Sequence, residues 1–285
     1  MSIRTVAKKD FKTASRSKAL WSVAIGLGLL FTLITYGYPI GRSSLSQAVM
    51  ELLTTLTMAI AILLPIVALV SSYMAIAGER ASGGIKFLLS FPNTRRDVFL
   101  GKLFSRITIV GAGVVFIFGA TVSMILAKYS VVPIQTVIGL FVLTVGYGAI
   151  FVGIAVALSA AVASRTRAIA TAIGAYFLLV IFYVVPFFRF STIIQWIHTT
   201  ILGFSPNPDL YNAITYTSPF IAFRKATNLV FPDNHDALIF QRATEVANSS
   251  LPFYLTDVFS LVIVAVWLIL PPVIGYFRFN RADLV

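Results

Sequence analysis

Six stretches of about 20 or more residues carry no charged side chain, and they limit what this chain can fold into more than any other feature. They cover residues 19–41, 52–77, 107–127, 134–163, 168–188 and 258–277. Because the apolar core of a bilayer is about 30 Å thick, a helix needs about 20 apolar residues to cross it. Charged residues make up 11% of the chain and apolar residues 58%, whereas soluble domains carry about 25% charged residues. The sequence therefore predicts an all-α integral membrane protein with six transmembrane helices, multi-pass in the cell membrane.

The distribution of Lys and Arg predicts the orientation of these helices. With the N-terminus inside, 16 of the 22 Lys and Arg residues lie on the inner side. Cytoplasmic loops of membrane proteins carry an excess of these residues. Both termini should therefore be cytoplasmic, and topology explains the net charge of +12 without nucleic-acid binding.

The apolar pattern divides the chain into four parts. Residues 1–18 place Ile3, Val6 and Phe11 on one side and Lys8 and Lys9 on another, which is typical of a basic amphipathic helix in the headgroup region. We expect this helix to be a lipid-facing anchor, with a partner contact as the alternative. Residues 19–189 hold transmembrane helices 1–5, residues 190–256 form an extracytoplasmic helical loop, and residues 257–285 hold the last transmembrane helix and a cytoplasmic tail.

A polar segment, residues 78–104, separates the second and third apolar stretches. Gly83 and Gly84 free the backbone to turn, and Pro92 stops the short apolar helix that follows them. Thr94 and Asp97 have the spacing of a capping box that starts the next helix. The segment is either a docking element or a topological loop whose arginines bind anionic lipid.

The same segment resembles the first cytoplasmic loop of ABC-2 type transporter permeases. In that family this loop forms the coupling helix, which sits in a groove of the ATP-binding subunit. The resemblance implies ATPase-coupling roles for Glu79, Arg80, Gly83, Gly84, Leu88, Leu89, Pro92, Arg95, Arg96, Asp97, Gly101 and Lys102. The ending 277–284 also resembles the aromatic-basic-Asp-Leu ending of the family. Six apolar stretches and an amphipathic N-terminal helix match the family's architecture, so the resemblance covers the whole chain.

The chain lacks the residues that would let it act alone. Gly101-Lys102 is followed by Leu103 and has no Gly five residues before it, so it cannot form a phosphate-binding Walker A loop. No predicted transmembrane helix has an internal charged residue for ion coupling. We expect no catalytic residue and no bound cofactor, with ATP and Mg²⁺ held by a separate ATPase subunit. A metal site at Asp233, His235 and Asp236 is disfavoured, because these residues are adjacent in one loop.

Two features lie within the transmembrane helices. Small residues recur every four positions along the fourth stretch and favour close helix packing, either within one bundle or at a homodimer seam: Ala149, Gly153, Ala157 and Ala161. Pro65 should kink the second helix and is a candidate for the wall of a transport pathway.

The loop 190–256 is too apolar for a disordered linker. Its pattern predicts helices near 193–202 and 219–230, a break at 206–208, and a third helix at 236–248. ABC-2 permeases carry re-entrant outer helices at this position. Asn248-Ser249-Ser250 is a possible glycosylation site.

These features predict the permease subunit of an ATP-driven ABC-2 exporter. Two copies, or one copy and a related permease, would pair in the membrane, each with one cytoplasmic ATPase. A non-transporting membrane scaffold with a partner-binding outer loop is the alternative, and a lipid-modifying enzyme using that loop is a third. Lipids, hydrophobic drugs or peptides, and glycans all suit apolar transmembrane helices as substrates.

Overall fold

The structure is a computed structural model that describes residues 3–39, 44–84, 94–185, 190–231 and 252–282. Six of its helices are long and apolar enough to cross a membrane, which confirms the predicted all-α, six-helix class. They are α2 (Lys18–Gly37), α3 (Leu45–Ser72), α6 (Arg95–Tyr129), α7 (Ile134–Ala161), α8 (Arg165–Tyr176) with its continuation, and α13 (Asp257–Arg281). The continuation of α8 is a π-helical turn, η1 (Phe177–Ile181), followed by α9 (Phe182–Val184).

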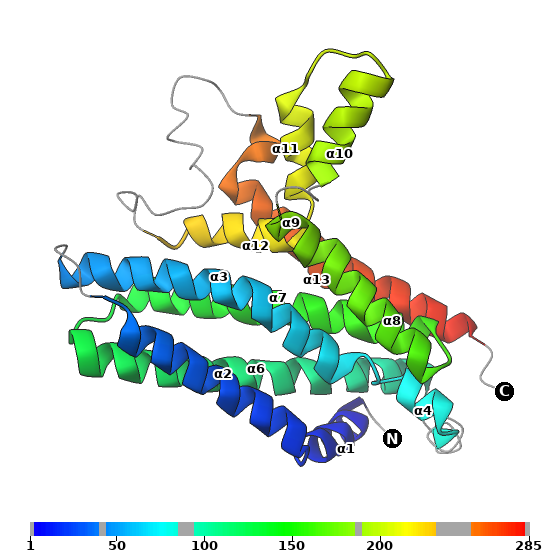
Figure 1. Cartoon of the computed structure of the whole chain (residues 1–285). Coiled ribbons are helices and arrows are strands. Elements are labelled where there is room, and N and C mark those ends of the chain that lie inside the picture. Colours follow the sequence, from blue (N-terminus) through cyan, green and yellow to red (C-terminus); the bar gives the residue numbers. More distant parts are fainter. Residues whose placement is uncertain (1–2, 40–43, 85–93, 186–189, 232–251, 283–285) are drawn as a thin grey trace.

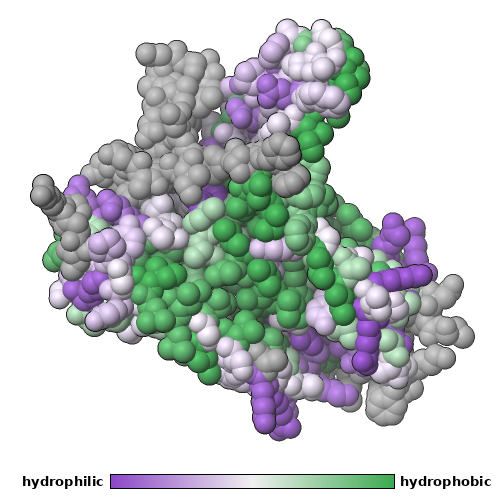
Figure 2. All heavy atoms as spheres, in the orientation of Figure 1, coloured by the Kyte–Doolittle hydropathy of each residue, from purple (hydrophilic) through white to green (hydrophobic). Residues whose placement is uncertain are grey.

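The helix α7 lies at the centre of the bundle. It packs against α3, α6 and α13, and its residues 147–157 are all buried. Figure 1 shows α2, α3, α6 and α7 running side by side, with α8 and α13 crossing them at an angle. Both termini lie at the same end of the bundle, together with α1 (Ile3–Ala14) and α4 (Ala77–Ala81). We call this the basic end; Figure 2 shows hydrophilic side chains at both ends of the bundle and an apolar band between them.

Capping boxes start two of the long helices. Thr94 accepts a hydrogen bond from the backbone of Asp97, whose carboxylate accepts one from the backbone of Thr94, so the predicted cap of the third helix is confirmed. Ser44 and Gln47 form a second capping box, and α3 therefore begins at Leu45, before the predicted start at residue 52. Ser44 and Gln47 are exposed, so the apolar pattern alone could not locate this start.

Close packing joins α7 to α13. A Cβ on Gly275 would lie 2.5 Å from the Cα of Ala157, and a Cβ on Gly153 would lie 2.9 Å from Pro272. Ala149 is also buried, whereas Ala161 is exposed. Two members of the predicted small-residue stripe, Gly153 and Ala157, thus serve helix packing within one chain.

The region between α9 and α13 is mostly helical where the structure describes it. It contains α10 (Phe190–Trp196), the π-helical η3 (Ile197–Ile201), α11 (Pro208–Tyr216), α12 (Pro219–Asn228) and the short η4 (Phe253–Leu255). The helices expected near 193–202 and 219–230 are confirmed, and α11 was not predicted. The third expected helix, the disfavoured metal cluster and Asn248 lie outside the described residues. Every residue of α12 is buried, and α12 packs against α3, α7 and α13.

Candidate functional site

The segment 78–104 lies at the basic end, running from α4 to the first turns of α6. Leu88, Leu89 and Pro92 lie outside the described residues. The structure places the other predicted coupling residues on either side of that gap: Glu79, Arg80, Gly83, Gly84, Arg95, Arg96, Asp97, Gly101 and Lys102. Gly83 has a φ of 74°, a left-handed conformation that favours glycine, so the predicted turn is confirmed there.

An ion cluster of four side chains joins three helices next to this segment. Lys102 of α6 lies 3.3 Å from the carboxylate of Asp10 on α1 and 3.1 Å from that of Glu79 on α4. Arg106, one turn further along α6, approaches Asp10 with its Nε at 3.1 Å and donates to it from a terminal nitrogen at 3.2 Å. The Nε approach is an ion pair without hydrogen-bond geometry.

The ion cluster is largely shielded from solvent. The side chain of Lys102 is 4% exposed, that of Asp10 11% and that of Arg106 17%. Arg106 also donates to the backbone oxygen of Ser71 in the last turn of α3, at 2.8 Å. Buried charges remain in a folded protein where paired groups compensate their lost hydration. Lys102 and Arg106 therefore use their charge within the chain and do not form an open basic surface.

The helix α1 docks on α6 beside the ion cluster. A Cβ on Gly101 would lie 2.7 Å from Cβ of Val6 and 3.1 Å from the backbone oxygen of Ile3, so only glycine permits this approach without movement. Val6 and Ala14 are buried, whereas Phe11 is 38% exposed. The apolar stripe predicted to anchor in lipid thus packs in part against protein.

Hydrogen bonds attach the start of the segment to the end of α7. The hydroxyl oxygen of Ser159 accepts from the backbone N–H groups of Ile76 and Ala77, at 3.0 and 2.9 Å. Arg80 donates to the backbone oxygens of Ala160 at 3.1 Å and Val162 at 3.4 Å. The bonds from Arg80 satisfy carbonyls that the end of a helix leaves without partners.

The end of the segment is attached to α13 in the same way. One terminal nitrogen of Arg95 lies within hydrogen-bond distance of three backbone oxygens in the last turn of α13, those of Phe279, Asn280 and Ala282, at 3.1, 2.7 and 2.8 Å. A cation at this position also complements the helix dipole. Arg96, the next residue, is exposed.

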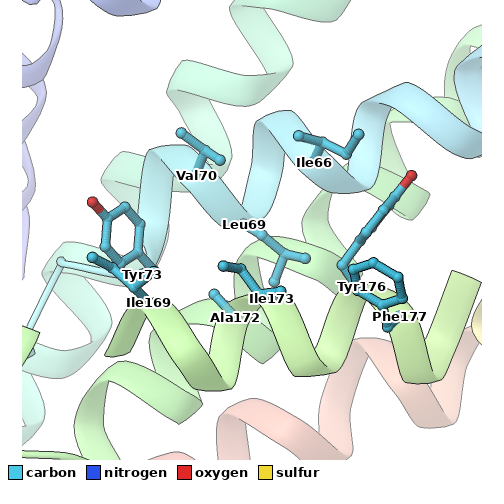
Figure 3. A pocket seen from close by; sticks show the side chains of 9 residues that line it. All are labelled: Ile66, Leu69, Val70, Tyr73, Ile169, Ala172, Ile173, Tyr176 and Phe177. Carbon is cyan, nitrogen blue, oxygen red and sulfur yellow. The ribbon is translucent and has the colours of Figure 1, made fainter. Parts of the chain in front are cut away.

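An apolar groove of about 400 Å³ runs between α3 and α8. Figure 3 shows its lining, which comes from both helices: Ile66, Leu69, Val70, Tyr73, Ile169, Ala172, Ile173, Tyr176 and Phe177. Pro65 lies inside α3 directly before this lining. The first residue of the π-helical turn, Phe177, also lines it, and such turns are frequent at functional sites.

Buried charges also occur on α12, the helix that packs against α3, α7 and α13. Lys225 pairs with Asp257 at 2.7 Å and lies over the ring of Tyr216. Arg224 is 5% exposed, and its guanidinium donates to the sulfur of Met58 at 2.8 Å. Burial lowers the pKa of Arg224 to about 10, so it stays protonated at neutral pH.

Sequence comparison identifies the family. Residues 4–284 match the family described as ABC-2 family transporter protein. The chain belongs to this family. Two relatives are each named probable ABC transporter permease protein NosY. The one from Pseudomonas aeruginosa is 29% identical over 188 residues, covering 63% of this chain and 67% of the relative. The one from Stutzerimonas stutzeri is 26% identical over 185 residues, covering 62% and 66%.

The family match spans nearly the whole chain. The alignments with the two relatives span about two thirds of each relative. The six long apolar helices agree with it. The ABC-2 chain is thus a transporter permease subunit and a multi-pass protein of the cell membrane.

Several residues of this site were not found from the sequence. Asp10 lies in the predicted interfacial helix, Ser159 in the fourth apolar stretch, and Arg224 and Lys225 in the predicted outer loop. Asp10 did carry a signal, because it is an acid within a basic helix. Arg224 and Lys225 follow Phe220, Ile221 and Phe223, and a helix that is apolar on several sides is typically buried.

Proposed function

We propose that this ABC-2 permease is driven by a separate cytoplasmic ATPase, which binds ATP and Mg²⁺ and docks on the segment 78–104, and that it exports its substrate. Family membership supports the ATPase partner. The position of the segment at the end of the bundle, between α4 and α6, supports docking there.

The observation that carries the proposal is that both ends of the segment are anchored on different helices. Arg80 and Ser159 hold its start on α7, and Arg95 holds its end on α13. The ion cluster adds α1 and α6. A partner that moves the segment would therefore move α6, α7 and α13 together. The close contacts at Gly153 and Gly275 keep α7 and α13 packed against each other during such a movement.

The basic side chains of the segment divide into two roles in this proposal. Arg95 is a positioning residue that transmits movement to α13. Arg96 is exposed and supplies the charge that attracts an acidic surface of the ATPase. Exposed charges affect association more than folding.

Single substitutions separate these roles. Arg96→Ala should lower the amount of ATPase that co-purifies with the permease, while the thermal stability of the permease stays unchanged. Arg95→Ala should leave more ATPase bound than Arg96→Ala does, but uncouple hydrolysis from transport. Normal co-purification of the Arg95→Ala/Arg96→Ala double variant would refute the electrostatic part of the docking.

We further propose that two copies pair so that the groove between α3 and α8 faces the transport pathway. The groove is open and apolar, which suits a hydrophobic substrate. Because the chain contains no cysteine, Val70→Cys introduces a single thiol at a position that is 59% exposed. A disulfide-linked dimer should form with Val70→Cys and not with Val266→Cys on α13; the reverse pattern would place the second copy elsewhere.

Pro65→Ala should change turnover more than assembly, and unchanged transport would remove Pro65 from the mechanism.

A further inference from the structure

A hollow of about 380 Å³ opens at the basic end, where the end of α7, the start of α8 and the last turn of α13 meet. Four arginines line it: Arg80, Arg167, Arg278 and Arg281. The rest of its lining is alanine and valine, from residues 160–163 and Ala282. Among the described residues that line it, none is acidic. We call it the arginine pocket.

One side of the arginine pocket is built from groups that hydrogen bonds hold in place. Arg80 is half-buried, and its bonds to the backbone oxygens of Ala160 and Val162 hold its guanidinium against the turn between α7 and α8. Arg167 lies in the first turn of α8, where its backbone N–H donates to the capping hydroxyl of Ser164 at 3.3 Å. Arg80 and the turn between α7 and α8 are thus held in place, whereas the side chains of Arg167, Arg278 and Arg281 are exposed.

The charges of Arg167, Arg278 and Arg281 are not balanced by a carboxylate within the described part of the chain. No carboxylate there forms an ion pair with Arg167, Arg278 or Arg281. Two of these arginines complement the dipole at the end of α13. The helix dipole of α13 does not explain why Arg80 of α4 and Arg167 of α8 line the same hollow. Converging guanidinium groups repel one another, and they bind phosphate well because their planar N–H groups match its oxygens.

An apolar surface leads away from the arginine pocket along α13. Ile274 precedes Arg278 by four residues and Phe277 precedes Arg281 by four, so each pair lies on one side of the helix. Ile274 is 50% exposed and Phe277 54%. A ligand with an anionic head and apolar tails would cover both surfaces. Basic pockets between transmembrane helices bind lipid headgroups in this way.

We propose that the arginine pocket binds the phosphate headgroup of an anionic phospholipid, with the acyl chains along Ile274 and Phe277. This site differs from the segment 78–104 that docks the ATPase in our proposal, although Arg80 borders both and Phe277 lines a neighbouring hollow with Arg96. The proposal does not depend on the ATPase or on the transported substrate.

The test compares lipid binding by the full chain and two double variants. Native mass spectrometry from detergent would count bound phosphatidylglycerol and phosphatidylcholine with the same acyl chains. Wild-type protein should prefer phosphatidylglycerol, and Arg278→Gln/Arg281→Gln should weaken its binding by about 10- to 30-fold, as expected for two arginines near a membrane surface. The matched control, Arg16→Gln/Arg165→Gln, removes two exposed arginines that do not line the pocket and should change binding less than about 3-fold.

A lysine variant and two soluble phosphate compounds separate binding of the lipid from loss of fold and from binding of free anions. If the glutamine variant is unstable, Arg278→Lys/Arg281→Lys keeps the charge and should still lower affinity, because lysine cannot make bidentate bonds to phosphate. Inorganic phosphate and glycerol 3-phosphate at millimolar concentration should not displace the lipid. Displacement by either would mean a site for soluble anions. Equal loss in both glutamine variants, or equal binding of the two lipids by wild-type protein, would overturn the proposal.

Discussion

Asp10→Asn should detach the N-terminal helix α1 from the bundle, because Asp10 is the carboxylate that Lys102 and Arg106 share. The substitution keeps the shape of the side chain and removes its charge. Lys102 would keep only Glu79, whose side chain is 36% exposed, and Arg106 would keep only the backbone oxygen of Ser71. Breaking a fully buried ion pair costs about 3–5 kcal/mol. Because Glu79 remains and Arg106 is 17% exposed, we expect a loss of about 2–3 kcal/mol here.

The assay is thermal unfolding of the purified permease in detergent. A loss of this size should lower Tm by roughly 4–12 °C, taking about 2–4 °C per kcal/mol for a large domain. Limited proteolysis should cut α1 faster in the variant. Lys9→Gln is the control, because Lys9 lies exposed on the same helix and its loss should stay within about 0.5 kcal/mol.

A double variant tests the cause. In Asp10→Asn/Lys102→Met the buried ammonium is removed together with its partner, so the double variant should be less destabilised than the sum of the two single variants. If Asp10→Asn unfolds at the same temperature as Lys9→Gln, the ion cluster does not hold α1, and the reasoning is wrong.

The remaining predictions concern helix packing and the buried arginine. Gly275→Ala should destabilise the permease by about 1–3 kcal/mol, because its Cβ would lie 2.5 Å from the Cα of Ala157. Gly119→Ala is the control, because nothing lies within 4 Å of the added Cβ, and it should be neutral or stabilise the helix by up to about 1 kcal/mol. Equal Tm values for the Gly275→Ala and Gly119→Ala variants would argue against the α7–α13 contact. Arg224→Met should raise Tm, since a pKa of about 10 against 12.5 for the free group corresponds to a burial penalty of about 3 kcal/mol. A lower Tm for Arg224→Met would mean that the cation has a stabilising partner in the native protein.

Local signals in the sequence were enough to predict the main helices. The uncharged apolar runs located six transmembrane helices, and the Thr94–Asp97 spacing located the start of α6. The Ser44–Gln47 spacing was an equally good signal for the start of α3, but it lies outside the apolar run that defined the predicted helix. The helix α11 begins at Pro208, within the stretch that was assigned as a break, since proline is also favoured in the first turn of a helix.

Contacts between distant helices could not be predicted in the same way. Arg95 and Arg96 are neighbours with the same local pattern, yet Arg95 binds carbonyls 184 to 187 residues away and Arg96 is exposed. Lys102 and Asp10 are 92 residues apart. An arginine or lysine gives the same local signal whether it meets lipid, a partner or a buried carboxylate. Only the packing of α1 and α13 on α6 decides between these outcomes.

The most direct test of the proposed function is whether an ATPase co-purifies with the permease through the segment 78–104. The chain would be co-expressed with its genomic neighbours, purified in detergent and assayed for ATP hydrolysis. A variant with residues 85–93 replaced by a neutral linker of equal length keeps Glu79, Arg80 and Arg95, and so should keep the fold. The proposal predicts an active ATPase with the wild-type chain and none with the linker variant. A wild-type chain that purifies without any ATPase, or a linker variant that retains it fully, would contradict the proposal.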